Sequence, residues 1–144
     1  MKILSFDPGG TTGVCFSNTQ NLKFDYSKKY FNSIVQWTDN VIDFLPLKEC
    51  IEETTPDLVV VESFKLYPWK AKAKIWDDFE EVQKIGAIKL TCLTNNIELV
   101  LQGANQKKFF KDKKLKEFNL YKNKTPHERD AIRHNLIYIM KNRI

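Results

Sequence analysis

MKILSFDPGGTTGVCFS, residues 1–17, is the part of the sequence that most constrains the fold. Residues 1–6 form a short apolar run of the kind found in strands, and the run stops at Asp7-Pro8-Gly9-Gly10, where proline and glycine favour a turn. Residues 12–17 again have the composition of a strand. We therefore expect two strands joined by a tight turn, with Asp7 at the end of the first.

The middle of the chain is expected to contain a third strand, a helix and a fourth strand. Residues 22–30 alternate enough for a strand, which would complete an antiparallel meander with the first two. Residues 32–53 carry apolar side chains at near-helical spacing, and Pro46 is expected to break or kink that helix. Residues 57–63, DLVVVES, form a nearly continuous apolar run, which is typical of a strand buried on both faces of a sheet.

The last part of the chain predicts two helices with a strand between them. Residues 75–95 have the spacing of a long helix and residues 97–102 the composition of a short strand. A final helix is expected to begin at Pro126, because Thr125 is a suitable N-cap and Glu128 lies three residues after it. The residues expected to face the core from helix 75–95 are Phe79, Val82, Ile85, Ile88 and Leu93.

This order of elements predicts the fold class. Three strands followed by helix, strand, helix, strand and helix indicate an α/β protein with a mixed sheet, an antiparallel three-strand meander plus parallel strands, flanked by helices. The RNase H-like fold has the same order. A length of 144 residues suits one compact unit, so we expect a single domain over residues 1–144.

Net charge, cysteine spacing and hydrophobicity limit the classes of protein to which this sequence can belong. A formal net charge of +5 permits a polyanionic partner without requiring one. Cys15, Cys50 and Cys92 have no CxxC spacing, so we expect buried thiols in a reducing cytoplasm rather than a zinc or redox site. No apolar run approaches the roughly 18 residues of a membrane span, and residues 1–6 are too short for a signal peptide, so a cytoplasmic location is expected.

Three carboxylates stand at the ends of predicted elements. Asp7 ends the first strand, Glu62 lies at the end of the apolar run 57–63, and Asp130 lies near the start of the last helix. If the first and fourth strands are neighbours and the helix packs on them, the three acids meet. Converging carboxylates repel one another unless they share cations, and hard oxygen ligands select Mg²⁺ or Mn²⁺. Two such ions in one site are the apparatus of phosphodiester hydrolysis.

Three short motifs in this order resemble the RuvC-like Holliday-junction resolvases of bacteria and their phages. They are Asp7-Pro8-Gly9 followed by Thr11-Thr12-Gly13, then Val59-Val60-Val61-Glu62-Ser63, then His127-Glu128-Arg129-Asp130-Ala131. The resemblance covers most of the chain and implies that Asp7, Glu62 and Asp130 hold two Mg²⁺ or Mn²⁺ ions. It further implies a homodimeric endonuclease of DNA recombination and repair that hydrolyses four-way junctions, of phage or prophage type and acting in the host cytoplasm.

The last helix departs from the resolvase pattern at His127. Many members of that family have a fourth carboxylate three residues before the last aspartate, and residues three apart share a helix face. His127 is therefore a candidate metal ligand or proton-transfer group, and simple residence in the first turn is the alternative. His134, one turn beyond Asp130, is a candidate for a hydrogen bond to a metal-binding carboxylate or for a position on the rim. Glu128 is expected to serve only the helix cap.

Two basic segments are candidate DNA-binding regions. Residues 102–124 hold eight lysines and two acids, whereas residues 31–64 hold seven acids and one lysine. Such a lysine density suits phosphate contacts, although a solvated surface is the plainer alternative. Residues 64–74 mix aromatic and basic side chains, which suits stacking on unpaired bases, with filling of the core as the alternative. The candidates are Tyr67, Trp69, Lys70, Lys72, Lys74, Lys107, Lys108, Lys111, Lys113 and Lys114.

Gly86 lies in the middle of helix 75–95, where glycine costs about 1 kcal/mol relative to alanine. Close backbone packing, against the sheet or against a second subunit, would account for it.

Other functions remain open on the same residues. A related nuclease of this fold that acts on other branched or RNA-containing nucleic acids would have the same acids. The turn Asp7-Pro8-Gly9-Gly10-Thr11-Thr12 also resembles the first phosphate motif of actin-like ATPases and sugar kinases, but these need two lobes and a second phosphate loop that this sequence lacks. A DNA-binding module without catalysis is disfavoured because all three acids are present.

Overall fold

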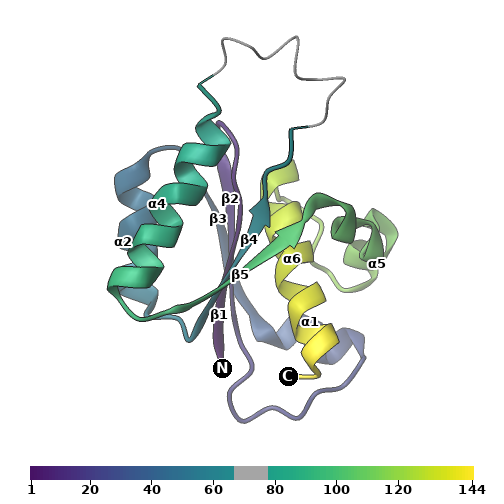
Figure 1. Ribbon diagram of the computed structural model, residues 1–144. Coiled ribbons are helices and arrows are strands. Elements are labelled where there is room, and N and C mark those ends of the chain that lie inside the picture. The colour runs from purple at the N-terminus through teal and green to yellow at the C-terminus, as the bar shows by residue number, and fades with distance from the viewer. Residues whose placement is uncertain (67–77) are drawn as a thin grey trace.

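The computed structural model describes residues 1–66 and 78–144. Its centre is a five-stranded mixed sheet with helices on both faces (Figure 1). The strands are β1 (Lys2–Asp7), β2 (Thr12–Asn18), β3 (Val35–Val41), β4 (Leu58–Ser63) and β5 (Glu98–Gly103). The helices are α1 (Lys28–Ile34), α2 (Phe44–Thr54), α4 (Glu80–Thr94), the 3₁₀ helix η2 (Ala104–Phe109), α5 (Asp112–Glu117) and α6 (Pro126–Asn142). Among the described residues, no helix has the length and apolar character needed to cross a membrane.

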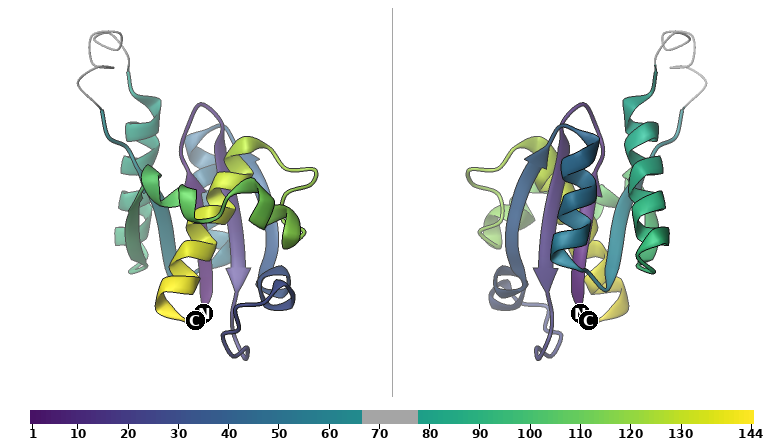
Figure 2. Two further views of the ribbon diagram at one scale, coloured as in Figure 1. Left: turned by 90° about the vertical axis from the view of Figure 1, so that its right-hand side faces the viewer. Right: turned by 90° about the vertical axis from the view of Figure 1, so that its left-hand side faces the viewer.

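The sheet has the order β3-β2-β1-β4-β5. Strands β1, β2 and β3 pair antiparallel, whereas β4 pairs parallel with β1 on one side and with β5 on the other. Helices α2 and α4 cover one face, and α6 covers the other, with α1 and α5 beside it (Figures 1 and 2). The predicted fold class, an antiparallel meander extended by parallel strands and flanked by helices, is confirmed.

Strand β4 supports both faces of the sheet, as its apolar run predicted. Leu58 and Val60 pack in the core beneath α6, and Val59 and Val61 pack in the core beneath α2 and α4. All four side chains are fully buried. Strand β4 therefore contributes to both cores, and the acid that follows Val61 emerges at its carboxyl end.

The structure corrects the prediction for residues 22–53. The third strand is β3 rather than residues 22–30, and the predicted helix over 32–53 is divided into the end of α1, β3 and α2. Strand β3 is an edge strand whose half-buried residues do not alternate regularly, so its sequence showed no clear period of two. Its β-branched and aromatic content favours a strand, and Trp37 stacks on Phe16 of β2 with ring centroids 5.5 Å apart.

Proline does not interrupt a helix in this region. Pro46 lies in the first turn of α2, where backbone N–H groups have no partner within the helix and a missing donor costs nothing. The break that it was expected to cause is therefore absent, and the separation of β3 from α2 comes before it.

Helix α4 begins later than predicted and turns a different face to the core. Residues 75–77 lie outside the described residues, and the helix starts at Glu80. Ile85 and Ile88 are buried as predicted, whereas Val82 and Leu93 are 46% and 75% exposed. Gly86 is exposed and has no atom within 4 Å of an added Cβ, so the expected packing of this glycine against the sheet is wrong.

The C-terminal elements follow the prediction closely. Two short helical pieces, η2 and α5, occupy the lysine-rich segment, and α6 begins at Pro126. Thr125 caps α6 by accepting a hydrogen bond from the Glu128 backbone, and the Glu128 carboxylate accepts one from the Thr125 backbone. All three cysteines are free thiols, with Cys15 and Cys92 buried and Cys50 partly buried.

Helix α6 is held against the sheet by a close approach and by buried polar contacts. A Cβ added to Gly13 of β2 would lie 2.1 Å from the His127 carbonyl group, so only glycine admits the start of α6 at this distance. Further along, the buried Ser5 hydroxyl donates to the Ala131 carbonyl, and the buried Asn135 amide donates to Ser5. These contacts set the position of α6 across β1 and β2.

We expect Gly13→Ala to destabilise the protein by about 1–3 kcal/mol, because the added methyl group collides with backbone that cannot yield without moving α6. Gly10→Ala is the matched control, since its Cβ would have only a Glu80 carboxylate oxygen at 4.0 Å. Denaturant unfolding followed by circular dichroism measures both. Equal stability of the two variants would contradict this account of Gly13.

Candidate active site

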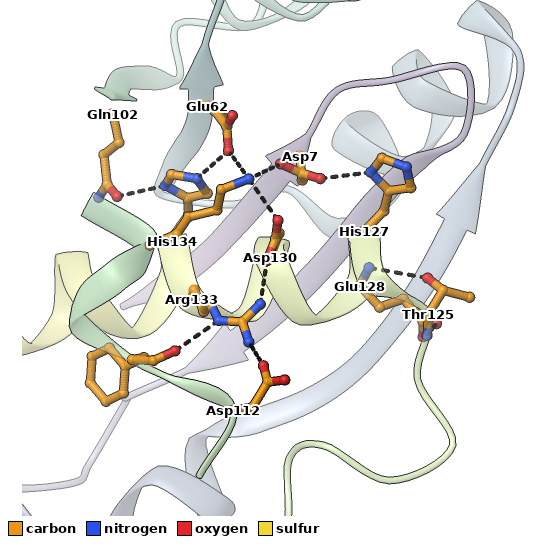
Figure 3. Close-up of polar contacts among 12 residues, drawn as sticks. Asp7, Glu62, Gln102, Asp112, Thr125, His127, Glu128, Asp130, Arg133 and His134 are labelled. Atoms are coloured by element: carbon orange, nitrogen blue, oxygen red, sulfur yellow. Dashed lines mark hydrogen bonds and ion pairs between the residues drawn. The ribbon is translucent and has the colours of Figure 1, made fainter. Parts of the chain in front are cut away.

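Three acids from distant parts of the chain lie around one ammonium group. Asp7 ends β1, Glu62 lies near the end of its parallel neighbour β4, and Asp130 lies in the second turn of α6 (Figure 3). The Lys107 Nζ atom lies 3.4 Å from Asp7 Oδ1, 2.8 Å from Glu62 Oε2 and 2.6 Å from Asp130 Oδ2. The three predicted acids therefore converge closely enough to contact a single cation.

Lys107 lies at this point because η2 follows β5 directly. Strand β5 is parallel to β4, so its carboxyl end reaches the same edge of the sheet as Glu62, and η2 starts there. Lys107 was predicted to contact DNA, and its position between the acids was not predicted, because one lysine in a lysine-rich segment carries no signal that distinguishes it from its neighbours.

The two histidines of α6 each bond one of the acids. His127 Nδ1 lies 2.7 Å from Asp7 Oδ2, with the imidazole 43% exposed. His134 is fully buried between Glu62 Oε2, 2.8 Å from Nε2, and Gln102 Oε1, 2.9 Å from Nδ1 (Figure 3). The predicted bond from His134 to a candidate ligand is confirmed, whereas Gln102, the partner that orients its ring, was not expected.

The donor set fits a hard divalent cation. One ligand atom each from Asp7, Glu62 and His134 lies within 4.8 Å of the others. Asp130 joins them through the shared contact with Lys107, and His127 borders Asp7. Carboxylate oxygens are the protein ligands that Mg²⁺ and Mn²⁺ take. The side chains can therefore hold the metal that the sequence predicted.

Burial and mutual repulsion perturb the acids strongly. Burial, followed by the contact with Glu62, raises the pKa of Asp7 to about 7. Burial acts in the same direction on Glu62, but hydrogen bonds with His134, Asp7 and Lys107 outweigh it and lower its pKa to about 2. The pKa of Lys107 is raised although burial opposes this, because Asp130 and Glu62 favour the charged ammonium. The cluster thus favours positive charge at its centre.

Arg133 fixes Asp130 from the side away from Lys107. Its guanidinium donates to Asp130 Oδ1 and to Asp112 of α5, and its Nε donates to the Phe110 carbonyl at 2.7 Å. The side chain is nearly buried, so these bonds are shielded from water. Arg133 therefore ties the position of Asp130 to the segment that follows Lys107.

Lys84 fixes the turn that follows Asp7. This lysine of α4 is fully buried, and its Nζ donates to the carbonyl oxygens of Gly9 and Gly10 at 2.7 Å and 2.8 Å. Glu80, one helical turn earlier, supplies the opposite charge at 2.8 Å. A single lysine in a helix carries no pattern that distinguishes a buried side chain from a solvated one, so the role of Lys84 was not predicted.

Glu128 does more than cap α6. Its carboxylate also accepts hydrogen bonds from Thr38 and Asn40 of β3, at 2.8 Å and 2.9 Å. The start of α6 is thereby bonded to the edge of the sheet, and the prediction that Glu128 serves only the cap is wrong.

The candidate DNA-binding residues are only partly described. Tyr67, Trp69, Lys70, Lys72 and Lys74 lie outside the described residues. Lys108, Lys111 and Lys113 are exposed, whereas Lys114 is half-buried over the ring of Phe118. A cavity of about 300 Å³ opens beside the acids, lined by Glu62, Ser63, Phe64, Lys65, Gly103, Ala104 and Asn105. The exposed lysines of η2 and α5 and this cavity flank the acids.

We expect Lys84→Met to lower the free energy of unfolding by about 1–3 kcal/mol, because it removes the ammonium donor from the buried Gly9 carbonyl oxygen and from the Gly10 carbonyl oxygen nearer the surface. Lys89→Met, at an exposed position of the same helix, is the matched control and should change stability by less than about 0.5 kcal/mol. Denaturant unfolding is the measurement. A Lys84 variant as stable as the control would show that the turn does not depend on this ammonium.

Comparisons with known proteins identify the fold. The sequence matches no family model and no curated protein. Among solved structures, RuvC of Thermus thermophilus in complex with a Holliday-junction substrate has a TM-score of 0.71 at 14% identity, over 99% of this chain and 95% of that one. A second T. thermophilus RuvC structure has a TM-score of 0.67 at 12% identity, over 99% and 98%.

A viral enzyme has the same architecture. The fowlpox virus resolvase, in complex with substrate Holliday-junction DNA, has a TM-score of 0.58 at 18% identity, over 99% of each chain. At these identities the likeness concerns the course of the backbone. This chain therefore has the RNase H-like fold of the RuvC type over nearly its whole length.

Proposed function

We propose that this protein is a metal-dependent endonuclease that hydrolyses DNA phosphodiesters at four-way junctions. The observation that carries the proposal is the meeting of Asp7, Glu62 and Asp130 around one cation-binding point. The fold adds support, because two of the similar structures are complexes with Holliday-junction DNA. A site built from carboxylates at the carboxyl ends of β1 and β4 suits the hydrolysis of a phosphodiester.

In the proposed site, Asp7, Glu62 and Asp130 hold two Mg²⁺ or Mn²⁺ ions. Such ions, when bound, supply an activated water and stabilise charge on the phosphate and the leaving oxygen. His134 and Gln102 orient Glu62, and Arg133 orients Asp130, so each acid keeps its direction without the substrate. His127, which contacts Asp7 and is partly exposed, can ligate metal or accept and return a proton near the scissile phosphate.

The exposed lysines beside the site suit a polyanionic substrate. Lys108 belongs to η2, which carries Lys107 into the cluster, and Lys111 and Lys113 follow at the start of α5. We propose that these side chains contact DNA phosphates and orient the backbone toward the acids. Tyr67, Trp69, Lys70, Lys72 and Lys74 complete the proposed DNA-binding set. A related branched or RNA-containing substrate would use the same surface.

The test is cleavage of a synthetic four-way junction, compared with a linear duplex and an RNA–DNA hybrid, with Mg²⁺ and with chelator. We expect cleavage of the junction alone and only with metal. Asp7→Asn should lower the cleavage rate by at least about a thousandfold while junction binding in a mobility-shift assay persists.

Asp25→Asn, at an exposed position away from the acids, is the control and should cleave as the wild type does. Faster cleavage of the RNA–DNA hybrid than of the junction would indicate that the substrate contains RNA. Full cleavage activity of Asp7→Asn would contradict the proposed active site, provided that circular dichroism shows both variants to be folded.

We further propose that the protein is a homodimer that pairs through the outward face of α4. Val82, Leu90 and Leu93 are 46%, 62% and 75% exposed, and they lie on the side of the helix opposite buried Ile85 and Ile88. Gly86 lies among them with open space above its Cα, which allows a second helix to approach closely. Two copies related by a two-fold axis would present two sites to a symmetric junction.

Leu90→Glu should convert the dimer to a monomer, because it introduces a charge at the centre of the proposed apolar contact. Leu45→Glu, at an α2 leucine of similar exposure, 61%, is the matched control and should leave the dimer intact. Sedimentation equilibrium over a range of concentrations gives the masses. A wild-type monomer, or a Leu90 variant that dimerises as the wild type does, would contradict this interface.

A further inference from the structure

The ammonium of Lys107 occupies the point where the three acids meet. We propose that Lys107 is an internal counterion that competes with divalent metal for Asp7, Glu62 and Asp130, so that metal loads only by displacing it. The inference rests on the proposed function, because it concerns the same acids, and it adds a built-in control on metal loading.

The competition follows from the oxygen atoms involved. Lys107 Nζ contacts Glu62 Oε2 and Asp130 Oδ2 at 2.8 Å and 2.6 Å and approaches Asp7 Oδ1 at 3.4 Å. A Mg²⁺ ion binds carboxylate oxygens at about 2.1 Å and needs lone pairs of these same acids. An ammonium and a divalent ion at this point would repel each other at short range in a poorly solvated site. One must leave when the other binds.

The other contacts of the acids do not compete in this way. Asp7 Oδ2 bonds His127 and Asp130 Oδ1 bonds Arg133, whereas the His134 imidazole shares Glu62 Oε2 with Lys107. Among the described residues, Lys107 is the one cation whose ammonium or guanidinium contacts all three acids. Withdrawal of Lys107 would therefore leave each carboxylate with its own support and remove only the shared positive charge.

Lys107 is also placed so that it can withdraw. Its side chain is 24% exposed and projects from a short 3₁₀ helix at the surface, beside exposed Lys108. Lys84, in contrast, is fully buried and bonded to backbone carbonyl groups. The long flexible stem of lysine allows the head group to move into solvent while the backbone stays in place. The structure thus contains one fixed ammonium and one exchangeable ammonium near Asp7.

The test measures Mn²⁺ binding by isothermal titration calorimetry on the free protein, without DNA. Lys107→Met should bind Mn²⁺ at least about tenfold more tightly than the wild type, because binding no longer has to displace a cation. Its metal-free form should also unfold at a lower temperature than the wild type, because the acids lose their counterion. Lys107→Arg, which keeps the charge, should show no such gain in affinity.

Two controls tie the effect to the cluster. Lys108→Met removes the neighbouring exposed lysine and should bind Mn²⁺ as the wild type does. The double variant Lys107→Met with Asp7→Asn should lose the gain, since it lacks one of the acids. If metal-free Lys107→Met is unfolded at the temperature of the titration, both proteins are titrated at a lower temperature at which circular dichroism shows the variant folded.

Unchanged or weaker Mn²⁺ binding by Lys107→Met would overturn the inference, as would an equal gain in Lys108→Met. Because the assay contains no DNA, it is independent of the substrate. If the wild type fails to cleave junctions but Lys107→Met binds Mn²⁺ more tightly, the proposed function is wrong and the counterion role of Lys107 is supported. If the wild type cleaves junctions but Lys107→Met shows no gain in Mn²⁺ affinity, the proposed function is supported and the counterion role is wrong.

Discussion

The mutual repulsion of Asp7, Glu62 and Asp130 is the constraint on which the rest of the site depends. Carboxylates this close to one another, at a partly buried sheet edge, are unfavourable unless positive charge lies between them. The protein meets that requirement with Lys107 and tolerates a raised pKa at Asp7. The fold holds together and orients acidic groups that would otherwise move apart.

Three contacts bring the acids together: the pairing of two strands, the close approach of a helix to the sheet, and a lysine bonded to a turn. Parallel pairing of β1 and β4 brings Asp7 beside Glu62, and Gly13 lets the start of α6 approach the sheet, which brings Asp130 in. Lys84 then fixes the turn after Asp7. Each attachment comes from a different element, so the site forms only when the sheet, α4 and α6 have packed together.

Much of the fold was predictable from local pattern. The turn after Asp7, the apolar run before Glu62 and the capping box at Thr125 each depend on neighbouring residues, and each was found as expected. Residues 22–53 were not predictable in the same way, because an exposed edge strand such as β3 lacks the two-sided burial that marks β4. The spacing of its apolar residues fits a helix and a strand equally.

The acids of the site were predictable, but their supporting residues were not. Asp7, Glu62 and Asp130 end or begin recognisable elements, and the order of the elements predicts that they meet. Lys107, Gln102 and Lys84 acquire their positions only when β5 and α4 pack beside the first strands. A lysine in the sequence has the same appearance whether it is solvated or buried, so tertiary packing alone separates Lys84 and Lys107 from the exposed lysines around them.

The distribution of charge also orders the events at such a site. Within the proposed function, the exposed lysines of η2 and α5 would attract a phosphate backbone, whereas the carboxylates of the cluster would repel it. A phosphate would then approach Asp7 and Glu62 closely only when their charge is neutralised by more than one ammonium. Asp7, Glu62 and Asp130 would hold the divalent ions that add this positive charge, and Lys107, displaced from the acids, would be free to contact the anion. Within the proposed function, the same repulsion that makes the acids costly to assemble thus keeps phosphate away from the site until metal is bound.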